Sequence, residues 1–189
     1  MWVGQPPPPS APAIVYPDKF AGRTSAEKRA EIAKLLKADG HDALVISALD
    51  DIAWLFNIRG DDVEFSPLLL AYAVLTADGR ATLCVDARKI LPDVRAHLGA
   101  DVTISPYDVL PEVLQALPES AKVVAVDRDT GSKWLHDQVT GAGRKLKSIA
   151  DPIQPVKARK HPAELEGVRQ AQRTAMALQR AAQGIHRHH

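Results

Sequence analysis

Residue types that bind metals are scattered along the chain. It contains four isolated histidines: His41, His97, His136 and His161. None of them belongs to a paired motif such as HExxH, and the single cysteine, Cys84, has no companion for a cysteine-rich site. We therefore predict surface or helix-end histidines and a core thiol. The last histidines of the chain, at positions 186, 188 and 189, indicate a tail.

Carboxylates that follow predicted strands are the second candidates for chemistry. Asp86 follows the apolar run 83–85, and Asp127 and Asp129 follow the run 123–126. In nucleases with a ribonuclease-H-like sheet, acidic residues on neighbouring strands hold two divalent metal ions. The same residues also suit an N-cap and a turn before a helix. Because the sequence has no basic nucleic-acid face, we favour the capping interpretation.

Motifs for nucleophilic catalysis and phosphate binding are missing from the sequence. It has no GxSxG elbow, no Walker A loop and no GxGxxG loop. Gly141 and Gly143 follow a predicted helix instead of opening one, so they indicate a helix end and a turn. The chain therefore offers no recognisable nucleophile or nucleotide site.

The most distinctive segment runs from Leu49 to Gly60 and continues into a polar loop. Trp54 and Phe56 are expected to bury against a sheet. Asn57, Arg59 and Asp61 are expected to cluster where the helix ends and to form a polar network. Arg59 suits a bidentate pair with Asp61, Asp62 or a carboxylate of another domain. Two interpretations remain open: a salt bridge that orders the loop, or a polar network at a domain or subunit interface.

Composition limits the class of protein. The 189 residues are 46% hydrophobic and 25% charged, with a formal net charge of +1, so no global attraction to nucleic acid or anionic membrane is expected. One cysteine excludes an internal disulfide and favours a reducing, cytoplasmic compartment. The longest apolar stretch, 66–77, is shorter than the roughly 18–20 residues that span a bilayer.

Periodicity and turn residues predict alternating helices and strands over residues 21–151. Thr24 and Glu27 fit a capping box, which predicts a helix over 25–38. Asp78-Gly79 between two apolar runs predicts a hairpin. Further helices are expected over 48–56, 88–98, 107–117 and 130–139, and strands over 43–46, 68–76, 80–86, 102–104, 123–126 and 145–149. The fold class is therefore α/β, a three-layer mixed β-sheet flanked by helices.

Both ends of the chain differ from this middle region. Residues 1–20 are rich in proline and predict an extended connector. After residue 151, Pro162 suits the first turn of another helix. That helix carries apolar residues at spacings of three and four: Leu165, Val168, Ala171, Ala175, Leu178 and Ala182. Since the α/β unit is already complete, residues 152–183 are expected to be a connector and the opening helix of a further domain, followed by a tail over 184–189.

The segment from Leu49 to Leu75 resembles the middle domain of the three-domain Xaa-Pro aminopeptidases, also called aminopeptidase P. These enzymes remove an N-terminal residue that precedes proline. The flanks agree, since the sequence AGRTSAEKR at 21–29 resembles the entry to that domain. Residues 155–171 resemble the first helix of the pita-bread metallopeptidase domain. The resemblance implies a creatinase/prolidase N-terminal-domain-like fold with a ribonuclease-H-like motif.

The resemblance also implies cofactors and partners. Family catalysis uses two divalent ions, manganese in many members, held by two aspartates, a histidine and two glutamates of the pita-bread domain. None of those positions matches this chain, so we expect no catalytic residue, no metal ligand and no activity of the chain alone. The implied partners are the catalytic domain and the first N-terminal domain of the same polypeptide, in a cytoplasmic homodimer without nucleic acid or membrane.

Roles for particular residues follow from the same resemblance. The non-catalytic domains of the family aid assembly and narrow access to the active site. Asn57, Arg59 and Asp61 are then expected at a domain or subunit boundary. Leu165, Val168 and Leu178 are expected on the face that packs against the catalytic domain. The alternative is a stand-alone protein-interaction or dimerisation module without enzymatic activity.

Overall fold

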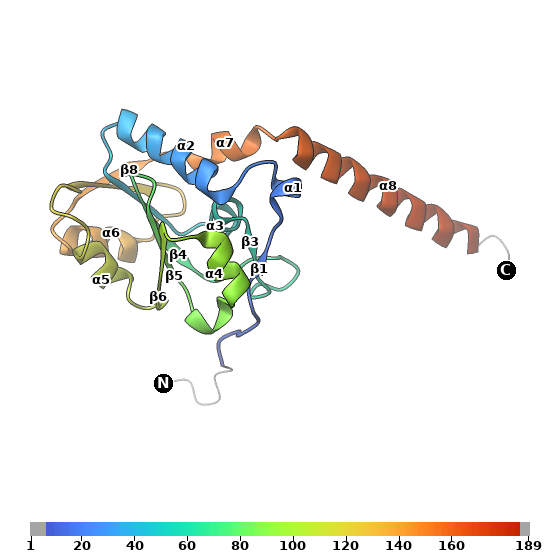
Figure 1. The fold of residues 1–189 in the computed structure, drawn as a ribbon, viewed down its shortest axis with the longest axis horizontal. Coiled ribbons are helices and arrows are strands. Elements are labelled where there is room, and N and C mark those ends of the chain that lie inside the picture. Colours follow the sequence, from blue (N-terminus) through green and yellow to red (C-terminus); the bar gives the residue numbers. More distant parts are fainter. Residues whose placement is uncertain (1–6, 186–189) are drawn as a thin grey trace.

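A six-stranded mixed sheet forms the centre of the molecule in the computed structural model, which describes residues 7–185. The strands lie in the order β6-β5-β4-β2-β7-β8 (Figure 1). Their bounds are β2 (Ala43–Ile46), β4 (Tyr72–Thr76), β5 (Ala81–Cys84), β6 (Val102–Ser105), β7 (Val123–Asp127) and β8 (Lys145–Ile149). The β2–β4 and β4–β5 pairs are antiparallel, and the other three pairs are parallel.

Helices cover both faces of this sheet. One buried apolar cluster joins the sheet to α2 (Ser25–Ala38), α3 (Leu49–Phe56), α4 (Pro92–Leu98) and α7 (Ile153–Ala158). A second cluster lies on the opposite face, under α5 (Leu110–Gln115) and α6 (Lys133–Gly141). The predicted three-layer α/β class with a mixed sheet is confirmed.

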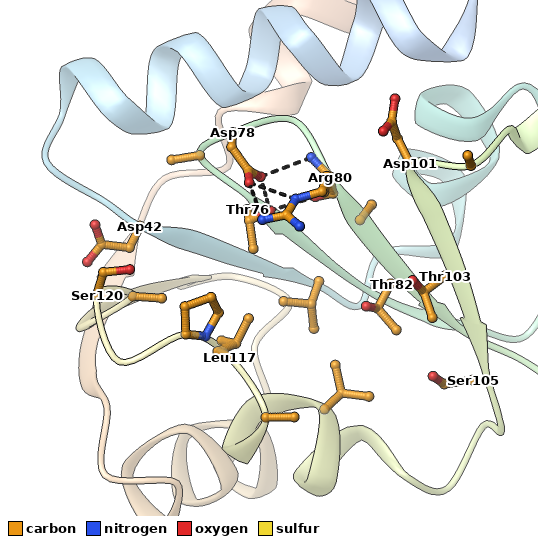
Figure 2. Close-up of a pocket in the computed structure, with 18 residues that line it drawn as sticks. Asp42, Thr76, Asp78, Arg80, Thr82, Asp101, Thr103, Ser105, Leu117 and Ser120 are labelled. Atoms are coloured by element: carbon orange, nitrogen blue, oxygen red, sulfur yellow. Dashed lines mark hydrogen bonds and ion pairs between the residues drawn. The ribbon is translucent and has the colours of Figure 1, made fainter.

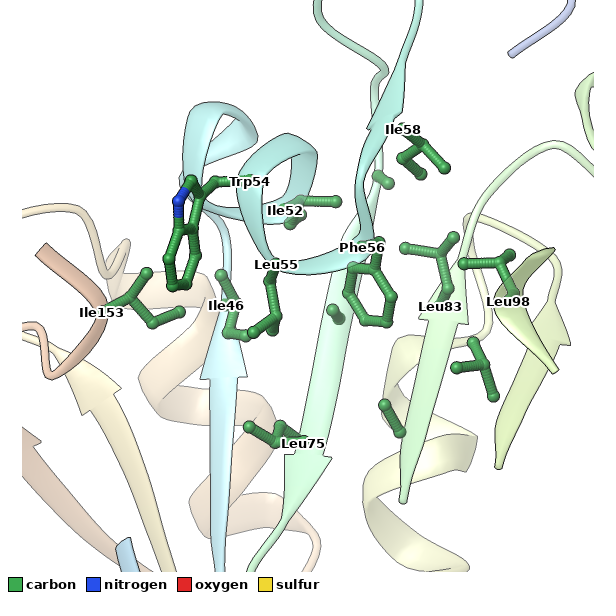
Figure 3. Close-up of a cluster of buried hydrophobic side chains, with 14 of the residues drawn as sticks. Ile46, Ile52, Trp54, Leu55, Phe56, Ile58, Leu75, Leu83, Leu98 and Ile153 are labelled. Carbon is green, nitrogen blue, oxygen red and sulfur yellow. The ribbon is translucent and has the colours of Figure 1, made fainter. Parts of the chain in front are cut away.

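The first cluster is built around α3, as its sequence predicts. Phe56 is fully buried and Trp54 is 7% exposed. Figure 3 shows Leu55 between Ile46 and Leu75 of the sheet, and Phe56 beside Leu83. Removing these side chains from water supplies about 2 kcal/mol each, so α3 is held by packing rather than by its own helix propensity.

The N-terminal part lies along the body as a strap of extended chain, residues 7–13. The Ala13 amide donates to the carbonyl of Lys89 at 2.9 Å. The chain then forms β1 (Ile14–Val15), which pairs antiparallel with β3 (Ile58–Arg59), and a short α1 (Asp18–Ala21). Sequence periodicity missed these three elements because each is too short to show a pattern. The proline-rich connector is therefore attached to the body from residue 13 onward.

Local signals with a physical mechanism are confirmed. Thr24 accepts a hydrogen bond from the Glu27 amide, and Glu27 accepts one from the Thr24 amide, so the capping box is complete. The hairpin turns at Gly79, whose φ of 87° favours glycine. Asp78 fixes that turn by accepting from the Arg80 amide at 3.1 Å.

The predicted strand over 68–76 is too long at its start. It begins at Tyr72, because the preceding residues bond to the loop after β3 instead of to the sheet. The Asp62 amide donates to the Leu68 carbonyl at 3.0 Å, and the Leu70 amide donates to Asp62 Oδ2 at 2.7 Å. The Leu70 amide thus bonds to the side chain of Asp62 instead of to the backbone of a neighbouring strand.

Proline and capping residues also shorten three predicted helices. The helix expected over 88–98 splits into a 3-10 turn, η1 (Ala87–Lys89), and α4, since Pro92 forces Leu91 into an extended conformation with ψ 164°. The helix expected over 107–117 starts at Leu110, with Pro111 in its first turn. The helix expected over 130–139 starts at Lys133, because Ser132 caps the Leu135 amide.

The C-terminal part contains two helices. Ile153 and Val156 of α7 are 1% and 3% exposed, so α7 belongs to the core although the prolines predicted a break there. The long α8 (Pro162–Ile185) then projects away from the body (Figure 1). Within residues 7–185, no helix has the length and apolar character needed to cross a bilayer.

Candidate interdomain site

Asn57 occupies the centre of a buried polar network. It ends α3 in the left-handed conformation, with φ 49°, and is 1% exposed. Its Nδ2 donates to Asp18 Oδ1 at 2.9 Å and to the Arg23 carbonyl at 2.8 Å. Its Oδ1 accepts from Lys28 Nζ at 2.6 Å. Asn57 therefore ties α1, α2 and α3 together from inside the body.

Lys28 is the second member of this network, and our sequence reasoning missed it. Its side chain is 2% exposed, donates to the Trp54 carbonyl at 3.0 Å and lies 4.4 Å from the centre of the Trp54 ring. Burial, only partly offset by the charge of Glu164, lowers the pKa of Lys28 to about 8. The available signal was the four-residue spacing to Ile32, which puts Lys28 on the buried stripe of α2.

Arg59 lies beside this network and is half-buried. Its Nη1 donates to the carbonyls of Ala53 and Ile58 at 2.8 and 2.9 Å, and its guanidinium stacks on the Tyr16 ring at 4.1 Å. Burial lowers the pKa of Arg59, and the group stays a cation in proteins. In the described part of the chain Arg59 forms no salt bridge with a carboxylate.

The structure does not bring Asp61 into the network with Asn57 and Arg59. Asp61 is exposed. The neighbouring Asp62 turns inward and pairs with Lys89 at 2.6 Å, with both side chains at most 3% exposed. The loop is therefore ordered by a buried salt bridge, but the pair is Asp62 with Lys89 instead of one with Arg59.

A groove of about 970 Å³ separates α8 from the body. Tyr16, Phe20 and Arg59 line one wall, and Val168 and Leu178 line the other. Leu165, Val168 and Leu178 are 41%, 51% and 67% exposed. The three apolar residues expected on the docking face thus lie on one helix and remain open to solvent.

The start of α8 is fixed on the body more tightly than the rest of the helix. A Cβ placed on Gly22 would lie 2.0 Å from His161 Nδ1, so only glycine admits this ring. Glu164 Oε2 accepts from the His161 amide at 2.8 Å, which satisfies one free donor before the helix. Contacts between α1 and α8 continue from this point.

The strand-end carboxylates have structural partners. Asp86 accepts from the Arg88 amide at 3.0 Å, and Asp127 accepts from the Thr130 amide at 2.9 Å, as the capping interpretation predicts. Asp51 accepts from Gln154 and pairs with Lys157 at 2.8 Å. Asp86 and Asp127 Oδ2 therefore serve as caps and Asp51 pairs with an ammonium group, whereas Asp127 Oδ1 is buried without a hydrogen-bond partner among the described residues. No group of three or more metal-ligating side chains occurs within the part of the chain that the structure describes.

Burial also raises the pKa of two other groups that could take part in chemistry. Cys84 is fully buried, and this raises the pKa of its thiol to about 11, so it is an unreactive core residue as expected. Burial, then a hydrogen bond shared with Asp51, raises the pKa of Asp151 to about 7. Asp151 lies beside Asp51 where β8 leads into α7.

A second hollow of about 700 Å³ lies on the other face of the sheet. The helices on that face leave β5 and β6 uncovered, and Figure 2 shows the hydroxyl residues Thr82, Thr103 and Ser105 there. At the hairpin end, Asp78 bonds Arg80 and Thr76 (Figure 2). The hydrogen bonds of Asp78 therefore order the hairpin end of the hollow.

Comparison with known proteins identifies relatives. Residues 4–164 match the family described as Creatinase/Prolidase N-terminal domain. A probable Xaa-Pro aminopeptidase P of Neosartorya fischeri is 40% identical over 173 residues, which cover 87% of this chain and 26% of the relative. One from Penicillium rubens is 36% identical, over 85% of this chain and 27% of the relative. The chain thus spans about a quarter of the length of these curated relatives.

Solved structures share the fold. An X-prolyl aminopeptidase from Caenorhabditis elegans, described as a cytosolic enzyme with a di-nuclear active site, superposes with a TM-score of 0.80 and 26% identity. The match covers 90% of this chain and 28% of that one. The N-terminal domain of the peptidase PepQ from Mycobacterium tuberculosis matches with a TM-score of 0.53, at 16% identity, over 98% of its length. The chain belongs to the creatinase/prolidase N-terminal domain family.

Proposed function

We propose that this chain is the non-catalytic middle α/β domain, with a connector helix, of a metal-dependent Xaa-Pro aminopeptidase. In this role it supports assembly of the enzyme and narrows access to its active site. One observation carries the proposal. The chain aligns with about a quarter of its relatives' length, and the apolar stripe of α8 has no cover among the described residues.

The boundaries of the proposed domains follow the packing. The connector is residues 1–20, and the α/β domain begins at residue 21. Because α7 is buried in the core, we place the end of this domain after α7, near residue 159, instead of at 151. The rest of this chain up to residue 183 is then the first segment of the catalytic domain. The proposed tail over 184–189 lies mostly outside the described residues.

Two surfaces are proposed to meet the rest of the enzyme. The first is the α8 stripe of Leu165, Val168 and Leu178. The second is the wall of the groove that contains Arg59, whose stacked guanidinium keeps donors available for a carboxylate from another domain. Asn57 acts indirectly, since it is buried and holds this wall in place. Asp61, exposed in the adjacent loop, lies near the same boundary.

The proposal includes properties of the whole enzyme. The two divalent ions, manganese in this proposal, bind in the catalytic domain. The full-length protein is a cytoplasmic homodimer that cleaves the bond before proline. The description of relatives as Xaa-Pro aminopeptidases supports the proposed cleavage, and the description of one solved structure as a cytosolic enzyme with a di-nuclear active site supports the compartment and the number of ions.

Reconstitution from two pieces tests the proposal. The chain is mixed with the separately produced remainder of its polypeptide, and complex formation and cleavage of an Xaa-Pro peptide with manganese are measured. We expect a complex that cleaves the peptide, and no cleavage by the chain alone. Changing Leu165, Val168 and Leu178 together to serine should abolish the complex, whereas Arg173→Ser on the opposite face of α8 should not.

Two results would contradict the proposal. Turnover by the chain alone above a blank without protein would place catalytic groups in it. A stable dimer of the chain that does not bind the remainder of the polypeptide would favour the alternative, an interaction or dimerisation module. The exposed stripe of a 24-residue helix is the observation that keeps this alternative in the test.

A further inference from the structure

Helix α7 is fastened to the start of α3 by a small set of polar contacts. Gln154 Nε2 donates to Asp51 Oδ1 at 3.0 Å, and Lys157 Nζ donates to the same oxygen at 2.8 Å. Asp151 Oδ1 accepts from the Ile153 amide at 2.7 Å and thereby fixes the start of α7. These contacts hold the segment from which α8 continues (Figure 1).

Three carboxyl groups meet beside these contacts. A hollow of about 10 Å³ at the carboxyl ends of β2 and β7 is lined by Asp51, Asp127 and Asp151. Residues 44–46 of β2 add an apolar wall, so charges are screened less here than in water. Asp51 is 1% exposed, and Asp127 Oδ1 is buried without a hydrogen-bond partner among the described residues. The hollow is therefore small, acidic and poorly solvated.

Little positive charge balances these carboxyl groups. Among the described residues, the ammonium group that pairs with them is that of Lys157, and Asp51 shares it with Asp50. The other residues that line the hollow carry no charge. Carboxylates that share a buried site do not all ionise, because each disfavours the charge of the next. One proton therefore takes the place of the missing cation, and Asp151, which hydrogen-bonds Asp51, binds it.

The proton makes a bond that the ionised groups lack. A protonated Asp151 donates to Asp51 and thus links the start of α7 to α3. Burial, and then this hydrogen bond with Asp51, raises the pKa of Asp151 to about 7. Because the pKa is raised, the proton is bound below pH 7 and is lost as pH rises through 7. After its loss, the carboxylates of Asp51, Asp127 and Asp151 repel one another.

We propose that a proton shared by Asp51 and Asp151 acts as a pH-sensitive latch, which holds α7 against α3 in acid and releases it as the pH rises. The side chains of Ile153 and Val156 remain anchored in the core, so release means more frequent local opening of α7. Helix α8 then loses the fixed segment from which it projects. The latch belongs to this chain alone and does not depend on the proposed aminopeptidase function.

NMR spectroscopy of the full 189-residue chain, with a chelator present to exclude metal ions, tests the inference. The side-chain carboxyl carbon of Asp151 reports its protonation, and hydrogen exchange gives protection factors for α7 and β2. We expect Asp151 to titrate near pH 7. The protection of α7 should be lower than that of β2 and should fall about tenfold from pH 6 to pH 8, since one pH unit below the folded pKa favours the closed state tenfold.

Two matched variants separate the latch from other titrating groups. Asp151→Asn imitates the protonated acid, because its amide keeps an acceptor for Ile153 and a donor for Asp51. Its α7 should have the same protection at pH 6 and pH 8. Asp50→Asn removes a carboxylate of the same helix turn that does not line the hollow, so it should keep the tenfold fall.

Several results would overturn the inference. In the parent chain, these are titration of Asp151 near its ordinary value of about 4, or protection of α7 equal to that of β2 at both pH values. In the variants, they are a tenfold fall that persists in Asp151→Asn or disappears in Asp50→Asn. The parent chain alone decides the inference where a variant folds poorly.

Discussion

The α/β body buries its apolar residues, whereas helix α8 leaves its apolar residues exposed. In the body, Ile32, Leu55 and Phe56 are fully buried. On α8, Val168, Met176 and Leu178 are all more than half exposed. An isolated helix gains little stability from local hydrogen bonds alone, so a long helix with an open stripe depends on a partner surface. The contrast separates a body that buries its own apolar residues from a helix whose apolar residues are open to solvent among the described residues.

The largest expected difference comes from matched apolar truncations. Phe56→Ala should lower the free energy of unfolding by about 3–5 kcal/mol, because it opens a cavity in the core. Leu178→Ala should change it by less than about 0.5 kcal/mol. Urea unfolding followed by circular dichroism measures both. Similar costs for the two changes would mean that α8 is part of the body's cooperative core.

A second test compares a buried salt bridge with an exposed one. Asp62→Ala should cost about 3 kcal/mol, since it leaves the Lys89 ammonium buried without its carboxylate. Glu166→Ala removes a pair with Arg169 on α8, whose side chains are 58% and 62% exposed, and should cost less than about 0.5 kcal/mol. The urea midpoints of unfolding of the two variants are compared. Equal midpoints would contradict the expected difference between the buried and the exposed salt bridge.

The pH dependence of stability should originate in the body, at Asp151. Its folded pKa of about 7 lies above the ordinary aspartate value of 3.8, so the folded state binds the extra proton between these values. This contribution is complete below about pH 4 and is lost as pH rises through 7. The full shift corresponds to about 4 kcal/mol, but Asp151 is partly exposed and screened, so we expect a loss of about 1–2 kcal/mol.

Asp151→Asn is the variant for this measurement. An uncharged side chain should remove the loss of stability between pH 4 and 8, so the variant should be more stable than the parent chain at pH 8. Thermal unfolding at a series of pH values detects the difference. An identical pH profile in the variant would show that another group titrates in this range.

The smallest expected effect compares the two helix starts. Thr24→Ala removes the capping box of α2 and should cost about 1 kcal/mol of body stability. Glu164→Ala removes the bond to the His161 amide at the start of α8. It should reduce helical signal without moving the unfolding midpoint of the body. A shift of that midpoint would show that the two regions unfold as one unit.

The sequence predicts those features that depend on local patterns. The capping box at Thr24, the glycine turn at Gly79 and the burial of Trp54 and Phe56 each rest on spacing or on a residue's own conformational limits. These rules also predict α8 from Pro162 and the apolar stripe. The predicted start of a helix was wrong where a proline such as Pro92 moved it. Proline disfavours the helical conformation of the residue before it, and this restriction was available from the sequence.

The network at the candidate site could be predicted only in part. Asn57 was found from its place at a helix end, and Arg59 from its residue type. The partners of the Asn57 side chain, Asp18 and Lys28, are 39 and 29 residues away in the chain, and a single sequence carries no signal for such pairing. The same limit explains why Asp62 pairs with Lys89 while Asp61 remains exposed.

Hydrogen exchange measures the contrast between body and helix most directly. In the chain alone, amides of β2, β4 and β7 should exchange only through global unfolding, whereas amides of α8 beyond its first turn should exchange nearly unprotected. Adding the remainder of the polypeptide should protect α8 and leave the sheet unchanged. Protection of α8 equal to that of the sheet in the chain alone, or no protection in the assembled enzyme, would contradict the account.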